Sequence, residues 1–187
     1  RRSGFDIWRM LTEFVYPRLE SSMQGRGLGH FAVKGYFSSE AFRGLIPTVD
    51  SKYNELVDAL KNGSDLCGLV YPSIFQGYSK SAATASFAEL APKLALGEQY
   101  GIALSGSLEL GSLLVGFPDL IISDEYYSPI LIDCGSQCGN DESLVTIYKS
   151  YGPHLEVWLT SNWLMPGVEQ VSEQWTAGLT LWAACSK

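Results

Sequence analysis

The last third of the chain, Tyr127 to Lys187, constrains the fold most because it is a succession of short apolar runs. The runs are Ser128–Asp133, Ser143–Tyr148, His154–Thr160 and Trp175–Trp182. Each is rich in β-branched and aromatic residues and is bounded by Gly, Pro, Asn, Asp or Ser. In the third run Leu155, Val157 and Leu159 alternate with His154, Glu156, Trp158 and Thr160, which is typical of a half-buried strand. The pattern predicts antiparallel strands in a sandwich or a barrel.

The first part of the chain mixes helical and strand patterns. Apolar spacing predicts a helix from Ile7, with Asp6 as the third residue after Ser3 in a capping box, and Pro17 ending or kinking it. A second helix is expected from Tyr53 to Leu60, and Ser79 to Leu90 fits either a helix or a long loop. Strands are expected at His30–Phe37, Leu66–Tyr71, Tyr100–Leu104, Leu108–Val115 and Leu120–Ile122.

The predicted fold class is therefore α+β and dominated by β-structure, an antiparallel sandwich with N-terminal and inserted helices. A length of 187 residues fits a single domain. We expect residues 1–26 to form a helical N-terminal extension and residues 27–187 to form the β-rich body.

Charge is scarce and unevenly distributed. Only 18% of residues are charged, with a formal net charge of −7. Residues 94–187 hold two Lys, no Arg and eleven acidic residues, a net of −9, which disfavours nucleic acid and anionic lipid there. The segment Arg1 to Arg26, with five Arg against three acids, is the one place where a phosphate contact is expected. No run approaches the eighteen apolar residues of a membrane span.

Low charge combined with many aromatic residues indicates a protein–protein interface, whose buried centre loses charges and keeps aromatics. The chain has five Trp and ten Tyr. The candidate interface residues are Trp8 on the N-terminal helix and Tyr151, Trp158, Trp163 and Trp175 in the β-rich half.

The residues that could carry chemistry form no established motif. Cys134 and Cys138 have the wrong spacing for a redox pair and no second pair to complete a zinc site. Cys134 with His154 and Asp133 has the residue types of a nucleophile triad, but neighbours on a strand point to opposite faces. Asp124, Glu125, Asp141 and Glu142 are weak calcium candidates. No cofactor is expected. The four Cys do not make a disulfide framework, which favours free thiols and a cytoplasmic assembly or virion over a secreted protein.

The C-terminal order of elements resembles the end of a jelly-roll coat protein of a picorna-like virus. A run such as Ser128–Asp133 is followed by a polar turn, a second run such as Ser143–Tyr148 and a last strand, here Ala177–Cys185. The resemblance covers about the last sixty to eighty residues. It implies a two-sheet roll that assembles into a shell and performs no catalysis.

Three functions are left open by the sequence. The first is a structural, self-assembling subunit whose partners are copies of itself or sister subunits. The second is an acidic, monomeric module that binds a basic protein. The third is a small enzyme that uses Cys134 or Cys67 with a His, or a pair of carboxylates. The absence of catalytic motifs favours the first.

Overall fold

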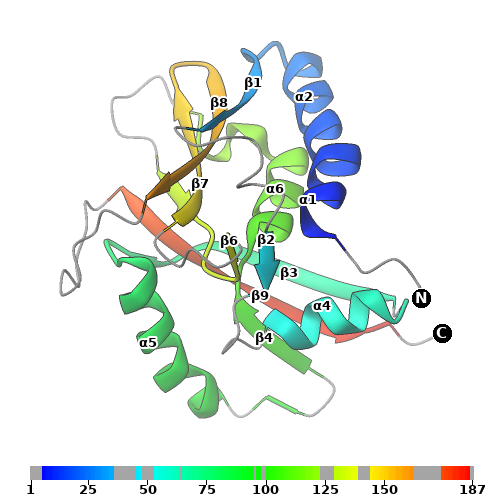
Figure 1. The fold of residues 1–187 in the computed structure, drawn as a ribbon, viewed down its shortest axis with the longest axis vertical. Helices are drawn as coiled ribbons and strands as arrows, with labels where there is room; N and C mark the ends of the chain where they lie inside the picture. Colours follow the sequence, from blue (N-terminus) through cyan, green and yellow to red (C-terminus); the bar gives the residue numbers. More distant parts are fainter. Residues whose placement is uncertain are drawn as a thin grey trace.

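The chain has a mixed α/β fold built on one open sheet (Figure 1). The structure, a computed structural model, describes residues 6–35, 45–47, 53–63, 65–94, 96–97, 100–122, 129–138, 144–161 and 174–185. The helices are α1 (Ile7–Met10), η1 (Leu11–Val15), α2 (Tyr16–Gly25), α4 (Tyr53–Lys61), α5 (Lys80–Leu90), η2 (Ala91–Leu94), α6 (Ser107–Gly116) and η3 (Pro118–Leu120). The strands are β1 (Phe31–Gly35), β2 (Leu45–Pro47), β3 (Leu66–Gln76), β4 (Tyr100–Leu104), β5 (Ile130–Ile132), β6 (Ser136–Cys138), β7 (Leu144–Tyr151), β8 (His154–Ser161) and β9 (Trp175–Ala184).

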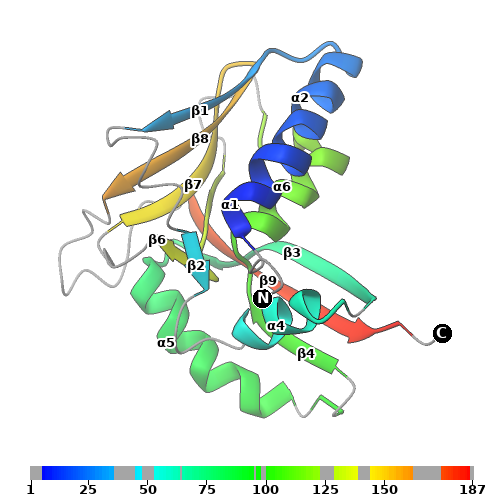
Figure 2. The same ribbon diagram turned by 45° about the vertical axis from the view of Figure 1, so that its right-hand side comes forward.

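The long strand β9 pairs with three other strands of the sheet, β3, β4 and β5. The strand order is β1-β8-β7-β5-β9-β3, with β4 also paired to β9, and β2 and β6 form a separate pair. One edge of β9 is paired along its length by β3 (Figure 2), while β5 and then β4 pair with its other edge. The β1–β8 and β5–β9 pairs are parallel and the remaining pairs are antiparallel.

The predicted fold class is confirmed only as a mixture of helices and strands, which occur in similar amounts, so β-structure does not dominate. The four C-terminal runs are strands β5, β7, β8 and β9, and antiparallel pairing predominates. The described strands form an open sheet and a short pair rather than two facing sheets, so a sandwich or jelly roll is not confirmed.

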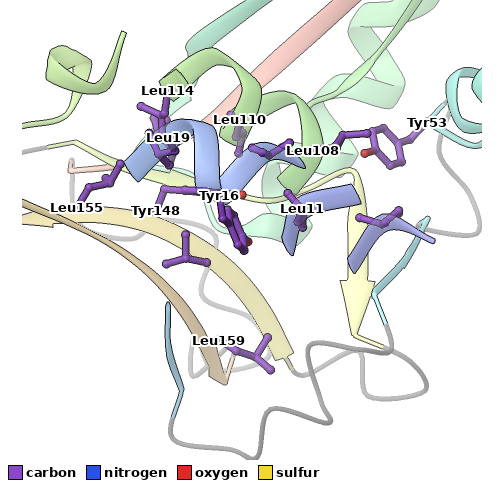
Figure 3. Close-up of a cluster of buried hydrophobic side chains, with 14 of the residues drawn as sticks. Leu11, Tyr16, Leu19, Tyr53, Leu108, Leu110, Leu114, Tyr148, Leu155 and Leu159 are labelled. Carbon is purple, nitrogen blue, oxygen red and sulfur yellow. The ribbon is translucent and has the colours of Figure 1, made fainter. Parts of the chain in front are cut away.

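Helices cover both faces of the sheet. Leu131 belongs to a first core cluster with Leu155, Val157 and Leu159, against which α1, η1, α2, α4 and α6 pack (Figure 3). The next residue, Ile132, belongs to a second cluster on the opposite face, which includes Phe87 of α5. The predicted alternation in β8 is confirmed, because Leu155, Val157 and Leu159 are fully buried.

The N-terminal helix continues past its proline. Asp6 is itself the N-cap, accepting a hydrogen bond from the Arg9 N–H at 3.1 Å, and Ser3 lies outside the described residues. Pro17 has no N–H, and the chain remains helical through one wide π turn in which the Tyr16 N–H bonds to the Leu11 C=O. The helix thus reaches Gly25.

Two predicted strands are wrong. Residues Leu108–Val115 lie in helix α6, which is buried on several sides, so its apolar run has no alternation by which sequence could separate helix from strand. In the second, Leu120 is the last residue of the short helix η3, and residues 121–122 follow that helix without forming a strand. Conversely, the ambiguous Ser79–Leu90 segment is helix α5, with the Ser79 hydroxyl capping the Ala82 N–H at 3.2 Å.

Candidate functional site

The candidate interface aromatics lie on different elements. Trp8 is half-buried beside Tyr16, with ring centroids 6.3 Å apart. Trp158 and Trp175 are half-buried against the second core cluster, and Lys149 Nζ lies 4.1 Å from a Trp158 ring centroid. Tyr151 is 74% exposed at the β7–β8 turn. Trp163 lies outside the described residues. The interface role of all five residues stays a prediction.

A different apolar surface is formed where β3, β9 and β4 run side by side. The registers place Leu69 beside Leu181, and Leu181 beside Ile102. Tyr71 lies opposite Leu179, and Tyr100 lies opposite Ala183. Because alternate residues of a strand share a face, Leu69, Tyr71, Leu181, Ile102 and Tyr100 form one surface, which we name the β3–β9–β4 face.

This face is apolar, uncharged and open to solvent. Leu69 is 52% exposed, Tyr71 49% and Tyr100 48%, while Leu181 and Ile102 are half-buried. Helix α5 packs on the same side of the sheet further along, over Leu104 and Leu179, and leaves these residues uncovered. No charged residue occurs between Asp65 and Lys80, and this absence of charge is the sequence signal that could have marked β3 as part of a candidate surface.

β3 also lies at the margin of the sheet, and its outer backbone groups can be identified. The Cys185 N–H donates to the Asp65 C=O at 2.8 Å, so Asp65 faces β9. Backbone groups alternate in direction along an antiparallel strand, so Cys67, Leu69 and Tyr71 also face β9. The N–H and C=O groups of Leu66, Gly68 and Val70 therefore point away from the sheet. Among the described strands only β9 pairs with β3.

A buried polar cluster lies where two turns meet. Asp133, just after β5, accepts hydrogen bonds from the Ser107 and Ser136 hydroxyls, and from the Ser136 N–H at 2.8 Å. Lys80 Nζ donates to the Ser136 C=O at 2.6 Å. The Cys134 and Gly135 N–H groups both donate to the Ser105 C=O at 3.1 Å. The cluster thereby joins the β5–β6 turn to the start of α6.

Burial shifts the acids of this cluster. Glu109, whose carboxylate accepts from the Gly106 N–H at 2.9 Å, has its pKa raised to about 7 by burial. Burial also raises the pKa of Asp133, against the opposing effects of Lys80 and the two serine hydroxyls. The residue types in the sequence suggested Asp133 as a partner of Cys134 and His154 but did not indicate its contacts with Ser107 and Ser136. The polar residues next to the apolar strands β4 and β5 were the sequence signal that could have indicated this buried cluster.

The predicted nucleophile triad is not brought together. Asp133 lies beside Thr146 of β7, whereas His154 pairs with Tyr151, five residues further along and about 17 Å away at strand rise. His154 lies instead against His30, with ring centroids 4.0 Å apart and its Nδ1 accepting from the His30 N–H at 3.1 Å. Burial raises the pKa of the Cys134 thiol to about 12, which opposes thiolate formation.

The expectation of free thiols is wrong for two of the four Cys. Cys67 of β3 and Cys185 form a disulfide across a sequence separation of 118. Cys134 and Cys138 are buried thiols. Spacing could not reveal the disulfide, because its partners meet only through the β3–β9 register, which places Cys67 opposite Ala183.

The remaining predicted contacts are placed as follows. In the described part of the N-terminal segment, Arg9 pairs with Glu13 at 3.0 Å, Arg26 with Asp119 at 3.0 Å, and Arg18 donates to the Phe14 C=O at 2.8 Å. The calcium candidates Asp124, Glu125, Asp141 and Glu142 lie outside the described residues. Within the described ranges no cluster of three His, Cys, Asp or Glu could hold a metal ion. In those same ranges no helix is long and apolar enough to cross a membrane.

Comparisons with known proteins give no match, whether to family models, to curated proteins or to solved structures.

Proposed function

We propose that this chain is a structural, self-assembling subunit of a coat or shell type, whose partners are copies of itself. The observation that carries the proposal is the β3–β9–β4 face. Contiguous exposed apolar residues on a folded domain mark interaction sites. Here Leu69, Tyr71 and Tyr100 are each about half exposed without a charged residue among them.

Charge supports contact at this face. The chain carries a net charge of −7, so two copies repel one another at long range. A contact through an uncharged surface adds no like-charge pair to that repulsion, and it removes apolar side chains from water. The resemblance to a coat-protein jelly roll agrees with a subunit role, and the two-sheet roll itself stays a prediction.

Charge insertion on the face tests the proposal. Tyr71→Lys should abolish or strongly weaken assembly in sedimentation velocity, because burying an unpaired ammonium group is costly. Phe117→Lys is the matched control, since Phe117 is 60% exposed at the end of α6 and lies off the face. We expect the control to assemble as the wild type does.

Tyr151→Lys tests the separate candidate at the β7–β8 turn. If Tyr151→Lys abolished assembly and Tyr71→Lys did not, the contact would lie at the β7–β8 turn and not at the β3–β9–β4 face. A wild-type protein that stays monomeric would contradict the proposed function as a whole.

A further inference from the structure

We propose that β3 pairs edge to edge with β3 of a second copy of this chain, antiparallel and about a two-fold axis at Leu69. The inference rests on the proposed function and names the partner and the mode of contact. It starts from the outward N–H and C=O groups of Leu66, Gly68 and Val70, which a further strand could bind.

Over Leu66 to Tyr71, the edge that β3 leaves unpaired among the described strands lacks the usual protection against such pairing. Natural edge strands are blocked by charged residues, prolines or bulges. In β3 the proline and the register shift come only after Tyr71, at Pro72. The preceding residues are uncharged and continue directly into the β3–β9–β4 face.

The opposite edge of the sheet, formed by β1, is protected against pairing with another strand. β1 pairs only with β8 among the described strands, and it carries the exposed Lys34. A lysine on an edge strand disfavours pairing with another strand. A head-to-tail contact of β1 with β3 is therefore disfavoured, and an isologous β3–β3 contact closes as a dimer instead of a filament.

A register centred on Leu69 gives the outward backbone N–H groups of β3 hydrogen-bond acceptors on the second copy. It sets Gly68 against Val70 of the partner subunit, and Leu66 against Pro72 of the partner subunit. The outward N–H groups of Leu66, Gly68 and Val70 then all have acceptors. Pro72, which has no N–H, takes part only through its C=O as an acceptor. Leu69 lies against its own copy and Tyr71 against Cys67 of the partner subunit, so the two exposed faces become continuous.

The first experiment removes one outward N–H. Val70→Pro deletes a donor that β9 does not use, whereas the matched Val70→Thr keeps the N–H and the β-branch. With one hydrogen bond lost per copy, the dimer dissociation constant from sedimentation should rise about tenfold or more for Val70→Pro. Val70→Thr should stay close to the wild type. Circular dichroism on each variant establishes that the fold is retained.

The second experiment tests the register and remains decisive if Val70→Pro fails to fold. In the Leu69-centred pair the Leu69 Cα atoms face each other at about 4.5 Å, within the range for a disulfide. Leu69→Cys should therefore form a covalent dimer under mild oxidation, located by mass spectrometry, and Lys34→Cys on β1 should not.

The outcomes separate this inference from the proposed function. Assembly that is weakened by Tyr71→Lys, but unaffected by Val70→Pro and not cross-linked by Leu69→Cys, would overturn edge pairing and leave self-assembly standing. A monomeric wild type would overturn both. Cross-linking through Lys34→Cys would instead place the contact between the β1 strands of two copies and would overturn the β3 pairing.

Discussion

At the scale of single residues, Asp133 holds the most concentrated set of polar contacts in the described core. It accepts from two buried hydroxyls and one N–H, and its removal would leave those donors without a partner. We expect Asp133→Ala to lower the free energy of unfolding by about 2–4 kcal/mol, measured by urea denaturation. Asp133→Asn keeps an acceptor for the Ser136 N–H and should lose less. Equal stability of Asp133→Ala and wild type would contradict the role assigned to this carboxylate.

Glu109 should make stability depend on pH. Its folded pKa of about 7 lies above its ordinary value of 4.5, so the folded state binds the more protons between these values. The contribution of Glu109 to the free energy of unfolding is fully present below about pH 4.5 and is lost as the pH rises through 7. Its upper limit is about 1.4 kcal/mol for each unit by which folding raises the pKa. Burial moves Asp133 in the same direction. Thermal unfolding from pH 5 to 8 should show this slope, and Glu109→Gln should flatten it. An unchanged slope in that variant would rule Glu109 out.

At the scale of elements, the contact between α6 and the N-terminal helix depends on Gly111. A Cβ at this position would lie 2.9 Å from Val15 Cγ1 and 3.1 Å from the Tyr148 hydroxyl oxygen, closer than the packed helices allow. Gly111→Ala should therefore destabilise the protein by about 1–3 kcal/mol. Gly116, in the same helix, has nothing within 4 Å of such a Cβ, so Gly116→Ala should be neutral or slightly stabilising. The ordering of the two melting temperatures checks the packing, and a reversed order would contradict it.

At the same scale, prediction from sequence succeeded where a strand is buried on one face and failed where an element is buried on several. Alternation identified β8 through Leu155, Val157 and Leu159. It could not assign α6, whose Leu108, Leu110 and Leu114 are all buried, because burial around the helix removes the periodic signal. Local capping by Ser79 decided α5, which an Ala-rich composition left ambiguous.

At the scale of the whole molecule, the mixed sheet could not be predicted, because strand order depends on contacts between distant residues. The parallel β5–β9 pair, the Cys67–Cys185 disulfide and the meeting of Ser107 with Asp133 all join segments far apart in sequence. The interface predicted from sequence, at four Trp residues and Tyr151, stays a prediction, and it did not include β3. That prediction relied on residue type, whereas exposure on β3 depends on its place at the sheet margin.

The disulfide adds a prediction for the whole fold. Cys67–Cys185 closes a loop of more than a hundred residues, and such a cross-link restricts the unfolded chain. A Cys67→Ser/Cys185→Ser double variant should be less stable than the oxidised wild type by about 2–4 kcal/mol. Its stability should match that of the wild type measured in reductant. A large difference between those two would show that the serines act through something other than the lost bond.

Association between copies of this chain would raise its molar mass in solution above that of one chain. Light scattering across a concentration series should give a mass above the 20.5 kDa of one chain, rising with concentration to a discrete multiple. A mass of 20.5 kDa at every concentration would contradict self-assembly and would favour a monomeric module that binds another protein.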